Sequence, residues 1–277
     1  ELHRVTPDVF SGWSPRDDRF AYSHSGYRAR AGKSIIARQR STDSTFDLIR
    51  VDDSAVGEVV LRKPIRSAPS RFNGLAEMDF SEVAAPGTYV VRAGERVTRP
   101  FRMGDDVWTP SIWKTLNFFY GNRCGFAVPG SHDVDLLDWS ASRGSDTIVM
   151  SGGWHDRGDL WQGVINTGEA TYAMLVLAER LRGAGGDPAL VARLIEEAKW
   201  GLEWTMRVRF PGGYRIQFSP HNLWTNNTVG DADDRHREAK NNPNANYIAA
   251  AAEGDAHRVP PDSGPALRAP PLRTPEE

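Results

Sequence analysis

The sequence contains a single cysteine, Cys124, among its 277 residues. One cysteine excludes an intrachain disulfide framework and a zinc site built from several cysteines. It leaves the redox compartment open, because a chain of this length can bury a core without covalent cross-links.

Long apolar runs and an excess of charge of one sign are also missing. No apolar stretch approaches the roughly 18 residues that a membrane-spanning helix needs, so we expect no membrane partner. Lysine and arginine number 34 against 36 aspartate and glutamate residues, which gives a net charge of −2. A surface that neutralises phosphates would show an excess of basic residues, so we expect no nucleic-acid partner either.

The composition indicates a globular chain of one or two domains. Hydrophobic residues make up 39% and charged residues 25% of the sequence, which is too apolar for a disordered chain. The first residue is Glu1 rather than methionine, so we expect a processed N-terminus or a fragment, with no signal peptide visible.

Residues 1–105 are expected to form a β-sandwich. Short runs rich in β-branched residues recur there and are separated by turn formers. Ala93-Gly94-Glu95 predicts a tight hairpin between the last two runs. The predicted strands are 34–38, 45–51, 56–62, 75–80, 88–91 and 96–103.

Residues 106–254 change to helical spacing and are expected to form a second domain. Asp187-Pro188 is typical of a helix start, an N-cap followed by proline at the first helical position. The predicted helices run from Pro110 to near Gly125, over 166–181, from Asp187 onwards, and from Pro243 through Ala252.

The two middle helices differ in their apolar pattern. The segment 173–177 is apolar nearly all round, which predicts burial of that helix on most sides. The next helix is amphipathic: Leu190, Leu194, Ala198 and Leu202 share one face, and the expected solvent face carries Arg193, Glu196, Glu197 and Glu203. Together they predict a helical hairpin.

Residues 255–277 break this pattern. Six of the 18 prolines lie within residues 253–277, and proline inside a helix costs about 3 kcal/mol. We expect a disordered or aberrant tail, which a truncation, a frameshift or a sequencing error would each explain.

The strongest chemical signal is the segment Ser151-Gly152-Gly153-Trp154-His155-Asp156-Arg157-Gly158-Asp159. Asp156 and Asp159 are three residues apart with a glycine between them, so the backbone can turn both carboxylates into one cleft. Two such carboxylates can hold and deprotonate the water that inverting glycoside hydrolysis requires. The alternative is an aspartate-rich turn that caps the following helix.

This segment resembles the signature of glycoside hydrolase family 9, the inverting cellulases built on a toroid of six helical hairpins. Residues 46–101 are similar to the immunoglobulin-like domain that precedes the catalytic domain in one branch of that family. The resemblance extends over about residues 22–254 and includes Phe118-Phe119-Tyr120-Gly121-Asn122-Arg123-Cys124-Gly125, Glu169–Leu175 and Glu197–Trp204.

The resemblance implies an immunoglobulin-like β-sandwich followed by part of an (α/α)6 toroid. It implies that Asp159 is the catalytic base and that Asp156 helps to hold the attacking water. Arg157 stands where the family usually has alanine, and its charge favours the ionised form of both carboxyls. The family's general acid is a glutamate late in the catalytic domain, and no residue of this chain matches it. A β-glucan substrate and a secreted or periplasmic location are also implied.

Four residues are candidates for substrate binding. Trp154 offers a flat apolar face to a pyranose ring, and His155 adjoins it in the same signature. Trp224 lies in a loop rich in asparagine and is a candidate either for stacking on a sugar or for simple packing. Val229-Gly230-Asp231 followed by His236 resembles a family segment whose histidine contacts the sugar, although the aromatic residue that often follows is absent.

The remaining candidates favour ordinary structural roles. Asp231, Asp233 and Asp234 form a possible calcium site, but their spacing lacks the pattern of a calcium loop, so a solvated loop is preferred. His155, Asp156, Asp159 and His221 show no metal-binding spacing, so we expect no metal and no other cofactor. Trp200, Trp204 and Cys124 are expected in the core. A non-catalytic module that binds a glycan or a protein is the alternative to an enzyme.

Overall fold

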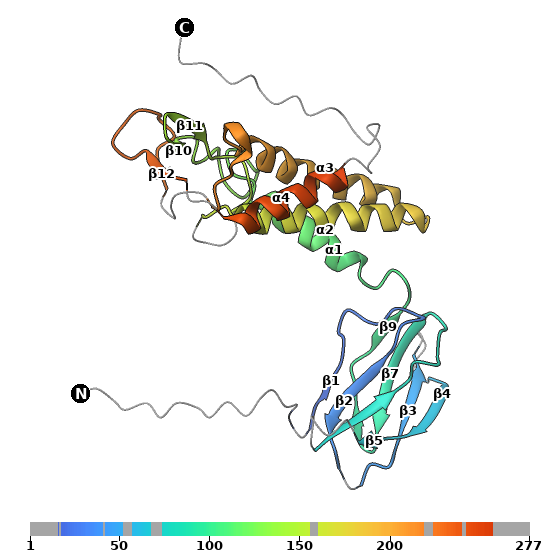
Figure 1. Ribbon diagram of the computed structural model, residues 1–277. Coiled ribbons are helices and arrows are strands. Elements are labelled where there is room, and N and C mark those ends of the chain that lie inside the picture. The colour runs from blue at the N-terminus through green and yellow to red at the C-terminus, as the bar shows by residue number, and fades with distance from the viewer. Residues whose placement is uncertain are drawn as a thin grey trace, which may run out of the picture. The chain divides into compact units, whose positions relative to one another are not determined.

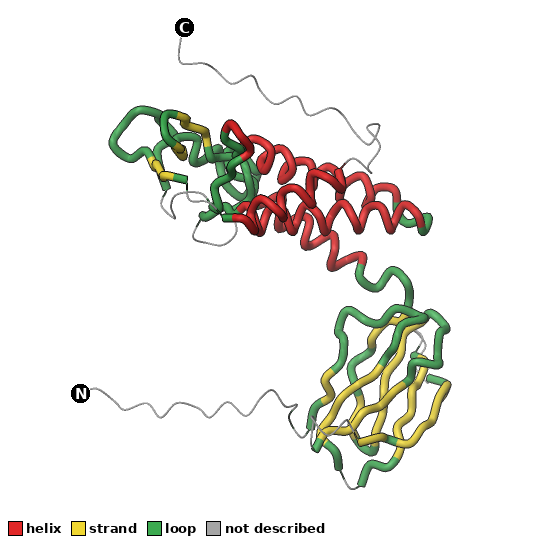
Figure 2. The backbone as a smooth tube through the Cα atoms, viewed as in Figure 1, coloured by secondary structure: helices red, strands yellow, loops and turns green. Residues whose placement is uncertain are grey.

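The computed structural model describes residues 16, 18–40, 42–51, 57–67, 74–155, 160–218, 224–239 and 242–256. The chain divides into two compact units, Glu1–Ile112 and Trp113–Glu277. Strands make up the regular structure of the first unit up to the start of a helix at Thr109, and helices dominate the second (Figures 1 and 2). This is the β-plus-α organisation that the sequence predicts.

Two sheets of the first unit pack face to face. One has the order β1-β2-β6-β5, and the other has the order β4-β3-β7-β8, with β9 also paired to β7. One hydrophobic cluster contains Ile35 and Met78 from the first sheet and Leu48 and Val91 from the second. The strands are β1 (Phe20–Ala21), β2 (Ser34–Arg38), β3 (Thr45–Arg50), β4 (Val59–Pro64), β5 (Arg66–Ser67), β6 (Leu75–Asp79), β7 (Gly87–Ala93), β8 (Arg96–Val97) and β9 (Phe101–Met103).

Two buried polar side chains fix the loops of this unit. The Tyr89 hydroxyl, at the start of β7, donates to the Ala85 carbonyl oxygen over 2.9 Å. The Lys33 side chain is 1% exposed, and its ammonium donates to the carbonyl oxygens of Ala29, Ala31 and Ser81 at 2.7, 2.9 and 3.1 Å. A buried ammonium needs such acceptors. These hydrogen bonds therefore connect the loop before β2 with the loop after β6.

The last predicted strand, 96–103, is wrong as a single element. The structure has two short strands, β8 and β9, separated by residues 98–100. Pro100 has no N–H to donate to a ladder, which breaks the run at that point. The predicted hairpin before it is confirmed: Arg92 pairs with Val97 across a turn in which Gly94 has a φ of 56°.

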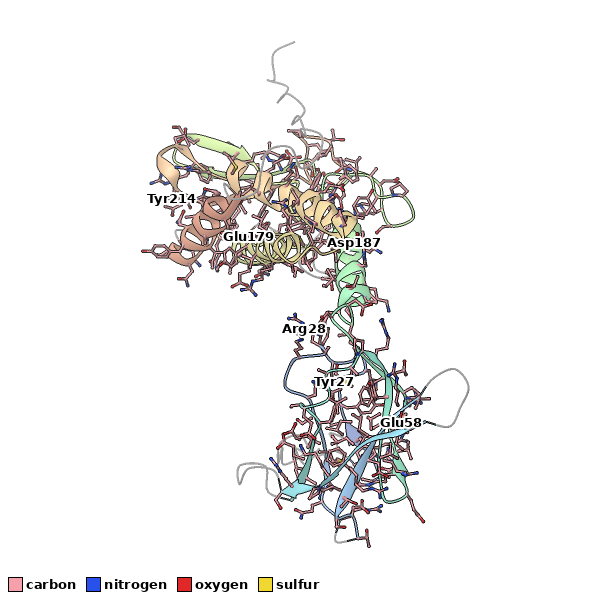
Figure 3. All side chains as sticks on the ribbon, turned by 90° about the vertical axis from the view of Figure 1, so that its right-hand side faces the viewer. Tyr27, Arg28, Glu58, Glu179, Asp187 and Tyr214 are labelled. Carbon is pink, nitrogen blue, oxygen red and sulfur yellow. The ribbon has the colours of Figure 1, made fainter. Side chains whose placement is uncertain are left out.

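The four predicted helices are present: the first crosses the boundary between the two units, and the other three lie in the second unit. They are α1 (Thr109–Gly121), α2 (Val164–Gly183), α3 (Pro188–Arg207) and α4 (Pro243–Ala256). Asp187, labelled in Figure 3, is the N-cap of α3, and its Oδ1 accepts from the Ala189 N–H over 2.9 Å. None of the helices in the described part of the chain has the length and apolar character of a membrane span.

Helix α2 packs along both α3 and α4. Glycines permit the close approach: a Cβ on Gly168 would overlap Ile248 of α4, and one on Gly201 of α3 would overlap Thr171. The buried residues of α2 recur every three or four positions and form one stripe, while Tyr172 is 45% exposed. Among the residues that the structure describes, α2 is therefore buried along one stripe only, and the expectation that it is buried on most sides is wrong.

The polar face predicted for α3 also needs correction. Glu197 is 0% exposed. The buried stripe of α3 includes Leu190, Leu194, Glu197, Gly201 and Trp204, which alternates steps of four and three. A spacing of four alone drifts off this stripe, because a helix has 3.6 residues per turn.

A small sheet in the second unit has no counterpart among the predicted elements. It contains β10 (Trp139–Arg143), β11 (Asp146–Val149) and β12 (Arg235–Glu238) in the order β11-β10-β12. β10 and β11 form a hairpin through Gly144, whose φ is 61°. β12 joins β10 in parallel. A 3-10 turn, Pro211–Gly213, follows α3.

Candidate functional site

The segment that carries the signature enters the core of the second unit after β11. The Gly153 carbonyl oxygen accepts from the Cys124 N–H at 2.9 Å and from Trp200 Nε1 at 3.1 Å. The Gly153 N–H donates to Gln162 Oε1 over 2.8 Å. A Cβ at position 153 would lie 2.8 Å from both Gln162 and Trp204, so only glycine fits there.

The two predicted catalytic residues, Asp156 and Asp159, lie outside the described residues, as do Arg157 and His221. The structure describes both flanks of the segment 156–159, namely His155 and Leu160. Leu160 is 7% exposed and has a φ of 63°, a left-handed conformation that is unfavourable for a residue with a branched side chain.

Trp154 is a buried residue that lines a small pocket. It is 3% exposed, its Nε1 donates to Glu197 Oε1 over 2.7 Å, and its ring meets Phe119 edge-on at 5.0 Å. A cavity of about 180 Å³ is lined by Phe118, Phe119, Trp154, His155, Asn166 and Thr167. The flat face expected for a sugar is thus largely covered by protein, and contact would be limited to the part of the ring that reaches the cavity.

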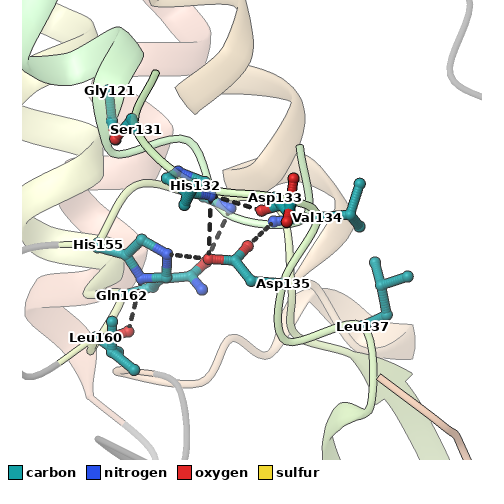
Figure 4. A network of polar contacts seen from close by, with 12 residues as sticks. Gly121, Ser131, His132, Asp133, Val134, Asp135, Leu137, His155, Leu160 and Gln162 are labelled. Carbon is teal, nitrogen blue, oxygen red and sulfur yellow. Dashed lines mark hydrogen bonds and ion pairs between the residues drawn. The ribbon is translucent and has the colours of Figure 1, made fainter. Parts of the chain in front are cut away.

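His155 is held at both ring nitrogens (Figure 4). Its Nδ1 lies 3.1 Å from the Leu160 carbonyl oxygen, and its Nε2 lies 2.9 Å from Asp135 Oδ2. Asp135 Oδ1 in turn accepts from the Gly125 N–H over 2.6 Å. His155 and Asp135 are 5% and 3% exposed, respectively, so this contact lies in the interior.

The two other candidates for substrate binding, Trp224 and His236, lie in a loop and on β12, respectively. Trp224 is 60% exposed, and its ring centre is 6.4 Å from that of His155. The structure therefore groups Trp154, His155 and Trp224. His236 lies on β12, exposed, where its ring nitrogens contact Ser140 Oγ at 2.9 Å and Ser142 Oγ at 2.7 Å.

Cys124, Asp135 and His155 bring potential metal-binding atoms close together, yet they are satisfied without a metal. Both His155 ring nitrogens are hydrogen-bonded. Burial, and then the Asp135 charge, raise the pKa of the Cys124 thiol far above its usual range, so the thiol stays neutral in this environment. Cys124 is 0% exposed in the core, as expected.

A second group consists of Asp138, Asp233 and Asp234, with one oxygen of each within 4.8 Å of the others. Asp138 is buried, and its oxygens accept from Thr225 and Asn227. Among the described residues, Oδ1 of Asp233 and of Asp234 has no hydrogen-bond partner. A side-chain hydrogen bond with Asp231, burial and neighbouring negative charges raise the pKa of Asp233. Oxygen-only ligands of this kind fit calcium.

Two residues that the sequence analysis missed organise this region. Glu197 accepts from Arg123 and Trp154, and Arg193 Nη2 lies 2.8 Å from its Oε2. Asp135 fixes His155. Glu197 and its partner Arg123 lie in segments that carry the family resemblance, so the sequence contained a signal for Glu197. Asp135 stands in a stretch without periodicity and had no comparable signal.

Comparison with known proteins shows where the chain has relatives. The family model described as glycosyl hydrolase family 9 matches residues 109–257, more than half of the chain. Endoglucanase C of Cellulomonas fimi is 27% identical over 236 residues, which covers 67% of this chain and 21% of that protein. The chain thus spans about a fifth of that relative's length.

Solved structures share the fold at lower identity. One titled Bacteroides ovatus GH9 superposes with a TM-score of 0.64 at 18% identity, covering 87% of this chain and 49% of that chain. A metagenome-derived glycoside hydrolase family 9 endoglucanase gives 0.61 at 22% identity, with 91% and 56% covered. The chain spans about half of each.

Proposed function

The chain belongs to glycosyl hydrolase family 9, and on that basis we propose that the protein hydrolyses β-linked glucans as a cellulase does. The observation that carries the proposal is the family match over residues 109–257, which includes the segment with Asp156 and Asp159. The endoglucanase relative supports the same substrate class. The activity proposed is that of the complete gene product.

We assign Asp159 as the general base and Asp156 as the residue that helps to hold the water. The base takes a proton from a water molecule that attacks the anomeric carbon on the face opposite the leaving oxygen, while a carboxylic acid protonates that oxygen. This single displacement inverts the configuration. In the family that the chain resembles, the general acid is a glutamate late in the catalytic domain. We assign that role to no residue of this chain.

The proposed sugar contacts follow the described surfaces. Trp224 is the stacking residue, because its exposed ring can lie against the apolar face of a pyranose. Trp154 and His155 line the adjacent cavity of about 180 Å³. His236 is assigned a contact with the sugar through the exposed face of its ring, because Ser140 and Ser142 already engage both ring nitrogens.

We further propose that the first unit is an immunoglobulin-like domain and that the helices are part of an (α/α)6 toroid. The strand order β1-β2-β6-β5 against β4-β3-β7-β9 corresponds to the two sheets of that sandwich. The hydrogen bond from Tyr89 to Ala85 corresponds to its tyrosine corner. The proposed domains are 1–105 and 106–254. Secretion is proposed because polymeric glucans lie outside the cell.

Hydrolysis with inversion tests the proposed function directly. Incubation of the complete gene product with a β-1,4-linked cello-oligosaccharide, followed by proton NMR at early times, should show new reducing ends that appear first as the α anomer. A β anomer at early times would contradict the inverting mechanism. Binding of the oligosaccharide without cleavage would instead support a non-catalytic glycan-binding module.

We also propose a calcium site at Asp138, Asp233 and Asp234, in place of the solvated loop that the sequence spacing favours, so calcium is expected to stabilise the second unit. A cation that binds only the folded state at about 100 times its Kd adds about 2.7 kcal/mol to the free energy of unfolding. The melting temperature should therefore rise by several degrees in excess calcium relative to a chelator. Asp234→Asn should lose most of this shift, whereas Asp146→Asn, an exposed residue on β11, should keep it. An equal shift in both variants would contradict the site.

A further inference from the structure

The imidazole of His155 connects the two residues that flank residues 156–159. His155 and Leu160 flank residues 156–159, and His155 Nδ1 lies 3.1 Å from the Leu160 carbonyl oxygen (Figure 4). The His155 N–H also donates to the Asn122 carbonyl oxygen over 2.9 Å. The ring therefore fixes the distance between the flanks, and the backbone bond fixes one flank to the chain after α1.

The orientation of that ring is set from its other side. Asp135 Oδ2 lies 2.9 Å from His155 Nε2, and Asp135 Oδ1 accepts from the Gly125 N–H over 2.6 Å. The Leu160 carbonyl oxygen can only accept, so a hydrogen bond between it and the ring requires a proton on Nδ1. The Asp135 carboxyl group holds the ring from the side of Nε2.

Backbone strain is concentrated at the same contacts. Within the described residues, left-handed φ values outside glycine occur at Leu136, Leu160 and Asn227. Leu136 follows Asp135 directly, and Leu160 is the residue whose carbonyl His155 engages. Both leucines belong to the core cluster. Strained residues of this kind persist where the surroundings determine the conformation, and they are frequent at active sites.

We propose that Asp135 and His155 are positioning residues for the reaction assigned to Asp156 and Asp159. Asp135 orients the imidazole of His155. The imidazole in turn holds the Leu160 carbonyl group close to His155. The geometric constraint that we infer is therefore the fixed separation of His155 and Leu160, the two described residues on either side of residues 156–159. The inference rests on the proposed function, and neither residue needs to touch the sugar for it.

Asp135→Asn tests this role, because it keeps the shape and an acceptor oxygen but removes the charge. In the complete gene product we expect kcat for a β-1,4-linked oligosaccharide to fall by about 10²-fold, the usual scale for a misplaced catalytic group. KM should change by less than about twofold. Turnover of β-cellobiosyl fluoride should fall by the same factor, because attack of water is common to both substrates.

Asp133→Asn is the matched control, because it makes the same chemical change two residues earlier in the chain. Asp133 is exposed and contacts His132 through its backbone carbonyl oxygen, so its replacement should change kcat by less than about twofold. An unchanged kcat in Asp135→Asn, or an equal loss in both variants, would overturn the positioning role. A parent protein that cleaves no glucan would instead overturn the proposed function.

A measurement on the unmodified protein does not depend on activity or on the folding of a variant. Nitrogen NMR of the His155 ring should show a proton on Nδ1, the atom that donates to the Leu160 carbonyl oxygen. If Nδ1 in the unmodified protein carries no proton, it cannot donate to Leu160, and the inference fails.

Discussion

Replacing Asp159 by asparagine is expected to abolish hydrolysis of β-1,4-glucan by the complete gene product. An amide cannot take a proton from water, and positioned proton transfer typically contributes about 10²–10⁴-fold to the rate. The same loss should appear with β-cellobiosyl fluoride. Fluoride leaves without a general acid, so a defect on both substrates identifies the base rather than the acid. Initial rates on the two substrates measure this.

Two companion variants make the result specific. Asp156→Asn should lower both rates by less than Asp159→Asn, because it loses a contact to water but keeps the base. Asp146→Asn removes one exposed carboxylate from β11 of the same unit and should retain the parental rates. Near-normal turnover by Asp159→Asn would place the base elsewhere in the protein.

Local signals predicted several of the helices and strands in the described part of the chain. The start of α3 follows from Asp187-Pro188, because capping depends on neighbouring residues alone. Pro243 is likewise the first residue of α4. The strand 34–38 matches β2 from end to end. Where neighbouring residues alone determine where a helix or strand begins, the sequence was sufficient to predict that boundary.

Contacts between distant segments were not accessible in this way. β12 pairs with β10 across 96 residues at Ser140 and His236, and nothing in either segment names its partner. Glu197 looks like a solvent-exposed helix residue until Arg123 approaches it from 74 residues away. A buried charge becomes favourable only when its partners are known.

At the candidate site, some features could be predicted from local sequence and others depend on contacts between distant segments. The signature segment predicted that Trp154 and His155 are important, and the structure gives both of them buried polar partners, Glu197 and Asp135. The sequence left open whether Trp224 packs or stacks, and its 60% exposure favours the stacking role proposed above. The roles of Asp156 and Asp159 stay predictions, which the Asp159→Asn experiment addresses.

Glu197→Gln is expected to cause the largest loss of stability. Glu197 is 0% exposed and bonds to Arg123 Nη2 at 2.9 Å, Arg193 Nη2 at 2.8 Å and Trp154 Nε1 at 2.7 Å. Glutamine has almost the same shape but turns one acceptor into a donor that faces other donors. Removing one partner of a buried ion pair typically costs about 3–5 kcal/mol of unfolding free energy. Urea denaturation followed by tryptophan fluorescence measures this loss.

Glu196→Gln is the matched control for that loss, with the same chemical change one residue earlier. The Glu196 side chain is 55% exposed, 3.8 Å from Arg123 Nη2 and 3.5 Å from Arg193 Nη1, and exposed pairs contribute about 0–1 kcal/mol. Because Trp154 Nε1 donates to Glu197, Glu197→Gln should also shift the tryptophan emission of the folded protein, whereas Glu196→Gln should not. Equal losses in the two variants would mean that the charge of the helix, rather than the buried contact between Glu197, Arg123 and Trp154, stabilises this region.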